Sequence, residues 1–367
     1  MSGNHAANTS PQRRIRVLIV DDSAIVRQLL TEICASDPEL EVVGTAVDPI
    51  VAREKIKLLA PDVLTLDVEM PHMNGVEFLE KLMRLRPMPV VMISSLTREG
   101  ADITLRALEL GAVDFVAKPL KDLATSLPAL RSEIIAKVKA AARAHIRLTG
   151  PRRTLRPAME SSRAVCSAEI IAIGASTGGV ETITELLTTF PTTIPAVVIV
   201  QHMPEAFVPR FAARLNGTLP FSVALAADGQ AVRPGQVVIA PGNRHVLVVR
   251  GKDGGLETRL SNDPPVSGHR PSVDALFGSI AALKATAVGI LLTGMGRDGA
   301  DGLLRMKEAG AITIAQDEQT STVFGMPRAA QELGAAKLIL PLPKIASALF
   351  APASITEPGT SGSKSGG

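Results

Sequence analysis

The chain has 367 residues, of which 46% are hydrophobic and 20% charged, with a formal net charge of +3. This length and composition predict a globular protein of two domains. No apolar run approaches the ~18–20 residues of a membrane span, and the polar segment Met1–Arg14 lacks the apolar core of a secretory signal. We therefore expect a cytoplasmic protein without direct membrane insertion. The small net charge and the scarcity of aromatic residues argue against nucleic-acid binding, and the two cysteines, Cys34 and Cys166, cannot form a disulfide framework.

Short apolar segments alternate with helix-like patterns through the first third of the chain. Such segments, separated by amphipathic stretches, predict parallel strands that helices cover on both faces. We expect a doubly wound α/β domain with five parallel strands over residues 15–135, whose strand ends meet at one edge. The expected strands are Arg16–Val20, Glu41–Ala46, Val63–Leu66, Val90–Ser94 and Val113–Ala117, and the expected helices are Ser23–Ala35, Pro49–Ala60, Gly75–Leu85 and Gly100–Leu110.

A basic stretch separates this domain from a second αβ series. Lys137–Arg163 contains eight basic residues and one acidic residue, and Gly150, Pro151 and Pro157 interrupt any regular pattern. We interpret residues 136–168 as an interdomain linker that includes the end of a helix at Lys137–Ile146, with docking toward an acidic partner as the alternative. Residues 169–350 are expected to form a second doubly wound domain, and the Gly/Ser-rich residues 351–367 a disordered tail.

The second domain is expected to combine parallel strands with an antiparallel meander. The turns at Pro241-Gly242-Asn243 and Asp253-Gly254-Gly255 favour hairpins between the three meander strands. We expect parallel strands at Ile170–Ile173, Ala196–Val200, Val288–Leu292 and Ala311–Ala315, helices at Val180–Phe190, Glu205–Leu215 and Gly302–Ala309, and meander strands at Gln236–Ala240, His245–Arg250 and Leu256–Leu260.

Acidic residues follow the strands of the first domain. Asp21 and Asp22 follow the first strand, Asp67 the third, Ser94-Ser95 the fourth and Lys118 the fifth. Carboxylates gathered at one edge repel one another unless a cation lies among them, and a hard divalent ion such as Mg²⁺ suits oxygen ligands. With the ion bound, Asp67 becomes a plausible nucleophile toward a phosphoryl donor, Lys118 neutralises the added charge, and Ser94 bonds a phosphate oxygen.

These residues resemble the response-regulator receiver family. The motifs are DDS (Asp21–Ser23), LDVEMPHMNG (Leu66–Gly75), the MISS segment and FVAKP (Phe115–Pro119). The resemblance implies a flavodoxin-like fold with Asp67 as phosphoacceptor and a histidine kinase as phosphoryl donor. It also implies that Mg²⁺ is held by Asp22, by Asp21 through water, by Asp67 and by the backbone carbonyl of Glu69. Ser94, Phe115 and Lys118 would be the switch residues, and Ser95 is the alternative switch hydroxyl.

A glycine-rich turn opens the second domain. Gly174-Ala-Ser176-Thr-Gly178-Gly179 follows a strand and precedes a helix, as in a nucleophile elbow, although such a turn can also cradle a dinucleotide. The dinucleotide interpretation requires an acid after the second strand, and that position holds Gln201-His202. Serine catalysis requires a histidine and a carboxylate instead, and His202 and Asp298 both follow parallel strands. We therefore predict that Ser176, His202 and Asp298 converge.

Other histidines and acids fit this arrangement less well. His245 lies in the expected hairpin, where a surface position is favoured, and His269 does not follow a predicted parallel strand. Asp228 and Asp253 lie in loop contexts where aspartate is common, and Asp274 fits a helix start. Asp301 lies three residues after Asp298 and is better explained as an acidic residue in the first turn of a helix.

The second domain resembles the catalytic domain of the chemotaxis protein-glutamate methylesterases. The motifs are IGASTGG (Ile173–Gly179), VQHMP (Val200–Pro204), APG (Ala240–Gly242), RPSVD (Arg270–Asp274) and LLTGMGRDGA (Leu291–Ala300). The resemblance implies an α/β hydrolase domain that needs no cofactor. Its substrates would be glutamyl methyl esters on the cytoplasmic helices of chemoreceptors, hydrolysed to glutamate and methanol, and specific receptor glutamines, which it deamidates. Thr177, Met295 and Arg270 would line the site or its oxyanion hole.

A switchable domain fused to an enzyme suggests gating, in which phosphorylation of Asp67 uncovers the edge of the sheet that carries Ser176.

Two other classes of function are possible. A DNA-binding output is disfavoured because the second half shows no helix-turn-helix pattern and no strongly basic face. A non-catalytic binding module would be distinguished by the effect of Ser176→Ala.

Overall fold

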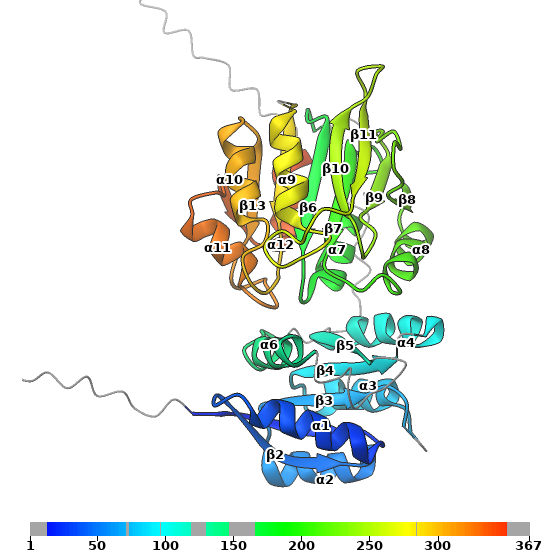
Figure 1. Cartoon of the computed structure of the whole chain (residues 1–367), viewed down its shortest axis with the longest axis vertical. Helices are drawn as coiled ribbons and strands as arrows, with labels where there is room; N and C mark the ends of the chain where they lie inside the picture. Colours follow the sequence, from blue (N-terminus) through cyan, green and yellow to red (C-terminus); the bar gives the residue numbers. More distant parts are fainter. Residues whose placement is uncertain are drawn as a thin grey trace, which may run out of the picture.

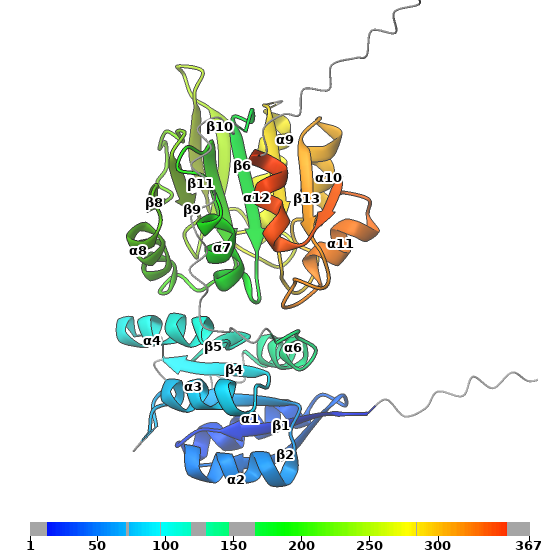
Figure 2. The same ribbon diagram turned by 180° about the vertical axis from the view of Figure 1, so that it is seen from behind.

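A computed structural model describes residues 13–70, 73–95, 97–118, 130–146, 166–283 and 285–350, which form two α/β domains stacked along the long axis of the molecule (Figures 1 and 2). The expected tail (351–367), most of the predicted linker and the segment Met1–Arg14 up to residue 12 lie outside the described residues. In the described part of the chain no helix is long and apolar enough to cross a membrane.

The N-terminal domain is the predicted doubly wound receiver. Its five strands pair in parallel in the order β2-β1-β3-β4-β5, which is the flavodoxin-like order. Helices α1 and α6 cover one face of the sheet, and α2, α3 and α4 cover the other. The elements are β1 (Ile15–Val20), α1 (Ala24–Ala35), β2 (Leu40–Ala46), α2 (Pro49–Leu59), β3 (Val63–Asp67), α3 (Gly75–Leu85), β4 (Val90–Ser95), α4 (Arg98–Glu109), β5 (Asp114–Lys118) and α6 (Arg131–Ala142).

Local sequence signals explain these boundaries. All of β3 is buried, as expected for a central parallel strand that is covered on both faces. Asp48 caps α2 by accepting from the Val51 amide, with Pro49 at the first helical position, and Asn74 caps α3. Helix α6 continues to Ala142 with its apolar side chains against the sheet, so a helix ends within Lys137–Ile146 as predicted. The domain limits themselves stay predictions.

The C-terminal domain contains one seven-stranded parallel sheet, in the order β14-β13-β12-β6-β7-β9-β8, and a separate antiparallel hairpin. Helices α9 and α10 and the hairpin β10–β11 lie on one face, and α7, α8 and α12 on the other (Figures 1 and 2). The strands are β6 (Ile170–Ala175), β7 (Ala196–Gln201), β8 (Ser222–Leu225), β9 (Gln236–Ile239), β10 (His245–Arg250), β11 (Leu256–Ser261), β12 (Ala287–Leu291), β13 (Ile312–Gln316) and β14 (Leu338–Leu340). The helices are α7 (Gly179–Thr188), α8 (Val208–Thr218), α9 (Val273–Ala282), α10 (Ala300–Glu308), α11 (Met326–Glu332) and α12 (Leu342–Phe350).

The chain leaves β6 toward β7 on one side and returns at β12 on the other, so a topological switch point lies beside β6. Ligands of such sheets bind at the carboxyl ends of the strands near this point. The predicted three-strand meander is wrong in one respect. The strand at Gln236–Ile239 pairs in parallel with β7 and β8 and belongs to the main sheet, and only β10 and β11 form an antiparallel pair.

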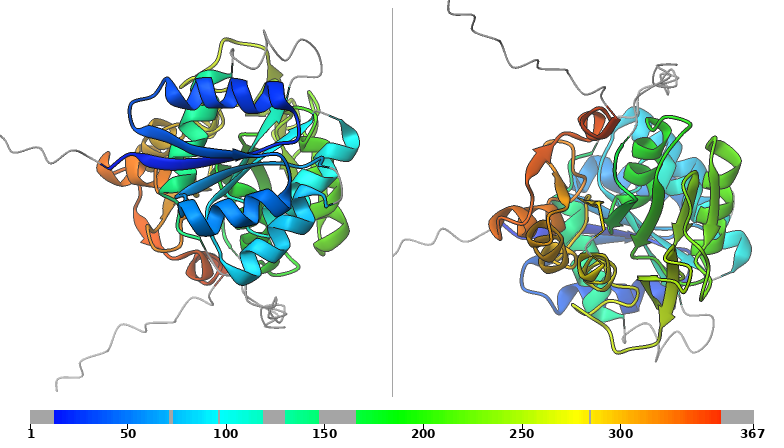
Figure 3. Two further views of the ribbon diagram at one scale, coloured as in Figure 1. Left: turned by 90° about the horizontal axis from the view of Figure 1, so that it is seen from below. Right: turned by 90° about the horizontal axis from the view of Figure 1, so that it is seen from above.

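The receiver packs against the carboxyl-terminal edge of the second sheet. Figure 3, which views the molecule along its long axis, shows the two domains overlying one another. The Phe115 ring of β5 contacts the Phe207 ring at a centroid distance of 4.4 Å, and the Thr177 hydroxyl donates to Asp114 at 2.5 Å. Arg210 pairs with Asp102 of α4 at 3.2 Å. The strand ends on which we predicted the catalytic residues therefore face the receiver.

Candidate active site and receiver pocket

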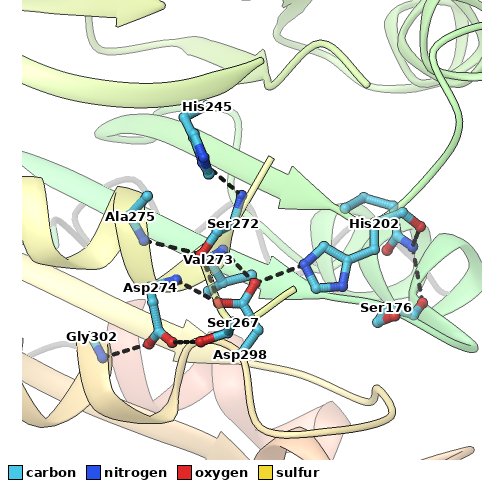
Figure 4. Close-up of polar contacts among 11 residues, drawn as sticks. Ser176, His202, His245, Ser267, Ser272, Val273, Asp274, Ala275, Asp298 and Gly302 are labelled. Atoms are coloured by element: carbon cyan, nitrogen blue, oxygen red, sulfur yellow. Dashed lines mark hydrogen bonds and ion pairs between the residues drawn. The ribbon is translucent and has the colours of Figure 1, made fainter. Parts of the chain in front are cut away.

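His202 and Asp298 form a hydrogen-bonded pair at the edge of the second sheet. The Nε2 atom of His202 lies 2.8 Å from Oδ2 of Asp298 (Figure 4). His202 directly follows β7, and Asp298 lies in the loop that connects β12 to α10. The Asp298 side chain is fully buried, and only 9% of the His202 side chain is exposed. Two of the three predicted catalytic side chains are therefore in direct contact.

The amino end of α9 holds the Asp298 carboxylate in place. The Ser272 hydroxyl and the Asp274 amide donate to Oδ1, and the Val273 amide donates to Oδ2, at 2.7 to 3.0 Å. Burial opposes ionisation, but the His202 ring and these donors outweigh it and lower the pKa of Asp298 to about 2. Asp298 is thus a fixed anion that orients the imidazole.

Ser176 lies at a tight strand-to-helix turn, one residue after β6. Gly178 adopts φ +75°, which disfavours residues with a side chain, and α7 begins at Gly179. A Cβ atom on Gly174 would lie 2.2 Å from Val273, so glycine is needed for α9 to approach β6. The pattern that predicted a nucleophile elbow therefore also brings Asp298 close to the nucleophile strand.

Ser176 lies beside the His202 ring, on the side opposite Asp298 (Figure 4). The Gln201 side chain joins the two residues, because its Nε2 donates to both the Ser176 and the His202 carbonyl oxygens at 2.9 and 3.0 Å. The Nδ1 atom of His202 is buried and has no hydrogen-bond partner among the described residues. This nitrogen is therefore available to a serine hydroxyl.

Two other histidines support the site. His269 stacks on His202 with the ring centroids 3.9 Å apart, and burial together with the neighbouring His202 lowers its pKa to about 4. His245 is 1% exposed, so the favoured surface position is wrong. Its Nδ1 accepts from the Ser272 amide and its Nε2 lies 3.2 Å from the Pro264 carbonyl oxygen. His245 thus fixes the residue that caps α9 and holds Asp298.

The three residues predicted to line the site have different surroundings. Met295 is half-buried and lines a cleft of about 850 Å³ between α6 and the second domain. The Thr177 hydroxyl is bonded to the receiver rather than to a catalytic side chain. The Arg270 guanidinium donates to the Asn262 and Asp263 carbonyls at the start of its own loop, and no contact with Ser176, His202 or Asp298 is found among the described residues.

Sequence reasoning missed several residues of the site. Gln201 lies within the VQHMP motif but was given no role, and Asp114 lies outside every motif, because the partners of both side chains lie far along the chain. Ser272 could have been found, since a serine before an apolar helical pattern is a usual cap. Asp274 does begin a helix as predicted, and it accepts from the Gly302 amide and the Ser267 hydroxyl.

The receiver pocket brings together the predicted acids. Carboxylate oxygens of Asp21, Asp22 and Asp67 lie within 4.8 Å of one another, and Lys118 pairs with Asp21 and Asp67 at 2.9 and 2.8 Å. Burial raises the pKa of Asp67 to about 6, an effect that Lys118 opposes and Asp21 reinforces. Burial also raises the pKa of Asp21. Close, buried carboxylates with excess negative charge and an exposed Asp22 are a donor set that fits a hard divalent cation.

The predicted switch residues connect this pocket to the domain interface. The Ser94 hydroxyl is buried and bonds Thr104 and Gly100 of α4, whereas the Ser95 hydroxyl donates to Glu69. Phe115 is buried against Phe207 of the second domain. The Glu69 amide faces Asp67 at 3.4 Å.

Comparison with known proteins agrees with the two domains. Residues 17–127 match the "Response regulator receiver domain" family model and residues 171–349 match the "CheB methylesterase" model. The two together define the class, a response regulator with an enzymatic output domain.

Relatives match nearly the whole chain. "Protein-glutamate methylesterase/protein-glutamine glutaminase 1" of Xanthomonas campestris pv. campestris is 53% identical over 92% of this chain and 97% of that protein. The protein of the same name from Caulobacter vibrioides is 54% identical over 88% of this chain and 93% of that protein. The crystal structure of the Thermotoga maritima CheB methylesterase catalytic domain is 36% identical and covers 50% of this chain and 98% of that one, with a TM-score of 0.48. The chain belongs to the protein-glutamate methylesterase/protein-glutamine glutaminase family.

Proposed function

We propose that this chain is a phosphorylation-regulated serine hydrolase of the chemotaxis system, in which Ser176, His202 and Asp298 form the catalytic triad. It removes methyl esters from glutamate side chains of chemoreceptors and deamidates specific receptor glutamines. The observation that carries the proposal is the His202–Asp298 hydrogen bond, which leaves the buried Nδ1 atom on the Ser176 side of the ring without a partner among the described residues.

Both reactions are acyl transfers that one site can perform. His202 accepts the proton of the Ser176 hydroxyl as the oxygen attacks the side-chain carbonyl carbon of the substrate. It then delivers that proton to the leaving group, so the ester releases methanol and the amide releases ammonia. Water attacks the acyl-enzyme with His202 as general base, which frees the glutamate carboxylate and restores Ser176. Asp298 stays ionised throughout, since its pKa is lowered to about 2.

Two backbone amides are suited to stabilise the tetrahedral oxyanion. The Ser176 amide is occupied, because it donates to the Thr293 carbonyl at 3.0 Å. Within the described residues, the amides of Thr177 and Met295 donate to no protein group. Each would supply a preoriented donor beside the nucleophile, and such a donor contributes roughly 3–4 kcal/mol to the transition state.

In the receiver, Asp67 is the proposed phosphoacceptor, with a histidine kinase as the donor. Asp21, Asp22, Asp67 and the Glu69 carbonyl would hold Mg²⁺, which would neutralise charge at the phosphoryl group when bound. Lys118 already contacts two of these acids, so it can follow a new phosphate oxygen. The Ser94 hydroxyl would exchange its partners on α4 for the phosphate, with Ser95 as the alternative.

Gating is supported by the packing of β5 and α4 against the catalytic rim. Thr177 directly follows the nucleophile and binds Asp114, which directly precedes the switch residue Phe115. A rearrangement at Lys118, four residues after Asp114, would loosen this packing and admit substrate. We place this activity in the cytoplasm, where the kinase and the receptor helices are accessible.

The test is methanol release from a methylated chemoreceptor fragment, with and without a small phosphoryl donor. The wild-type protein should release methanol faster when phosphorylated, and Ser176→Ala should abolish release. A truncated protein that begins at Ser161 should exceed the unphosphorylated full-length rate. Unchanged release by Ser176→Ala would refute the triad, and equal rates for the truncated and full-length proteins would refute the gating.

A further inference from the structure

The peptide group that joins Ser176 to Thr177 is held by its carbonyl oxygen. That oxygen accepts from the Gly179 amide at 2.8 Å and from Nε2 of Gln201 at 2.9 Å, so both of its lone pairs are used. A trans peptide is planar, and its N–H points away from its C=O. Fixing the carbonyl therefore also fixes the direction of the Thr177 amide, which donates to no protein group within the described residues. In a nucleophile elbow, the amide after the nucleophile belongs to the oxyanion hole.

The peptide group that joins Gly294 to Met295 is held in the same way. Its oxygen accepts from the Gly325 and Met326 amides at 3.0 and 2.8 Å, and the Met295 amide has no protein partner in the part of the chain that the structure describes. A Cβ atom on Gly294 would lie 2.9 Å from Cβ of Ser176, so this peptide runs directly beside the nucleophile. The two peptide groups therefore share one construction, in which two donors hold the carbonyl and the amide is left for the substrate.

Three of these four donors are backbone amides, and the fourth is the Gln201 side chain. Gln201 is 4% exposed, and its Nε2 also donates to the His202 carbonyl at 3.0 Å. Both partners of the side chain are acceptors, so the position calls for a group with two N–H donors, and a carboxylate of the same shape would repel both oxygens. The Oε1 atom packs against Gly179, where a Cβ atom would lie only 2.0 Å away. The carboxamide is therefore held in place on both sides.

We propose that Gln201 is a positioning residue of the oxyanion hole. Its carboxamide holds the Ser176 carbonyl so that the Thr177 amide faces the oxygen that becomes negatively charged. The inference rests on the proposed function, because the oxyanion forms only when Ser176 attacks an ester or amide carbonyl. A hydrogen bond to a carbonyl also polarises the N–H of the same peptide, so Gln201 strengthens the donor that it orients. Its effect passes through the backbone of Ser176, and Gln201 itself does not contact the reacting atoms.

The experiment measures methanol release from a methylated chemoreceptor fragment by the phosphorylated full-length protein. The test variant is Gln201→Met, which keeps an unbranched side chain of similar length and removes both N–H groups. The control variant is Thr313→Val, near the amino end of β13 and away from the catalytic rim. Thr313 is also buried and also joins two backbone groups, the Ala335 carbonyl and the Lys337 amide. Thermal unfolding compares the stability of the two variants.

Gln201→Met should lower kcat about 10- to 100-fold with little change in KM, because an oxyanion-hole donor acts in the transition state and removing one outright costs roughly 10²- to 10³-fold. Gln201→Asn keeps the carboxamide on a shorter side chain and should give an intermediate kcat. Thr313→Val should lower the Tm to a similar extent but keep the wild-type kcat. In Ser176→Ala protein, adding Gln201→Met should leave the affinity for the methylated fragment unchanged, because ground-state binding does not use the oxyanion donors.

Four results would overturn the positioning role. A wild-type kcat in folded Gln201→Met or Gln201→Asn protein would do so. A higher KM with an unchanged kcat would assign Gln201 to substrate binding. Weaker binding of the fragment in the Ser176→Ala background would assign it to the shape of the site, and an equal loss of kcat in Thr313→Val would point to general destabilisation. No methanol release by the wild-type protein would instead refute the proposed function itself.

Discussion

The hydrogen bond from Thr177 to Asp114 can be removed with little change in side-chain size. Thr177→Val keeps the shape of the residue but deprives the buried Asp114 carboxylate of its donor at the domain interface. Lys137 still approaches the same carboxylate at 3.4 Å, so the charge is not left without a partner. The substitution therefore weakens the closed arrangement selectively.

The expected increase in activity follows from the strength of the hydrogen bond that is lost. A hydrogen bond to an ionised group contributes about 1.5–3 kcal/mol. Losing it should favour domain opening by about 10- to 150-fold, since 1.36 kcal/mol corresponds to a factor of ten. Methanol release by the unphosphorylated full-length protein should rise accordingly, up to the rate of the freely open enzyme.

The assay compares full-length and truncated proteins that carry the same substitution. In the truncated protein that begins at Ser161, Thr177→Val should leave the rate unchanged, which controls for any effect on the neighbouring nucleophile. Asp114→Ala should activate the full-length protein similarly, and the double variant should add little to either single change. The reasoning fails if full-length Thr177→Val keeps the low unphosphorylated rate while its truncated form is fully active.

Three further predictions concern the two sites. Asp298→Asn should lower kcat by roughly 10³- to 10⁴-fold with a modest effect on KM, because the imidazole loses its orienting anion. Methanol release by the truncated protein measures this effect, and a loss under tenfold would contradict the role of Asp298. His245→Ala should lower kcat about tenfold by freeing the Ser272 amide, and His245→Gln should recover part of it, whereas a KM effect alone would point to the substrate-binding loop. Without metal, the protein should lose roughly 3 kcal/mol of folding stability as the pH rises from 3.8, the ordinary pKa of aspartate, to about 6, the raised pKa of Asp67. The loss arises because the unfolded chain releases this proton more readily than the folded one. Mg²⁺ should therefore raise the Tm strongly at pH 7.5 and little at pH 5, where protons compete for Asp67, and an equal rise at both values would contradict the raised pKa.

Much of the fold was predictable because parallel strands leave a strong pattern. The buried runs at β1, β3 and β4 are bounded by residues that end strands, so their limits fell within one residue of those expected. The strand β9 was misassigned to a meander because its hairpin-like turn at Pro241-Gly242-Asn243 leads on to β10, although β9 itself pairs with β7. Pairing partners far along the chain leave no local signal.

In the candidate site, too, the residues with a local sequence signal were predictable and the contacts between distant parts of the chain were not. Ser176, His202 and Asp298 were predictable from their positions after strands, since the doubly wound topology brings strand ends together. The bonds from Asp114 to Thr177 and from His245 to Ser272 were not, because they depend on how a second domain and a hairpin pack against the sheet. His245 looked like a surface residue because hairpin positions alternate, but it is buried and contacts both the Pro264 carbonyl and the Ser272 amide that precedes α9.

The packing of the receiver against the catalytic rim implies that the catalytic site also influences the receiver. If receiver and substrate compete for the same catalytic rim, then a bound substrate must favour the phosphorylated receiver to the same extent that phosphorylation favours substrate binding. Receptor abundance would then raise the equilibrium fraction of receiver that carries a phosphoryl group on Asp67, so the enzyme would respond to the amount of its substrate as well as to the kinase.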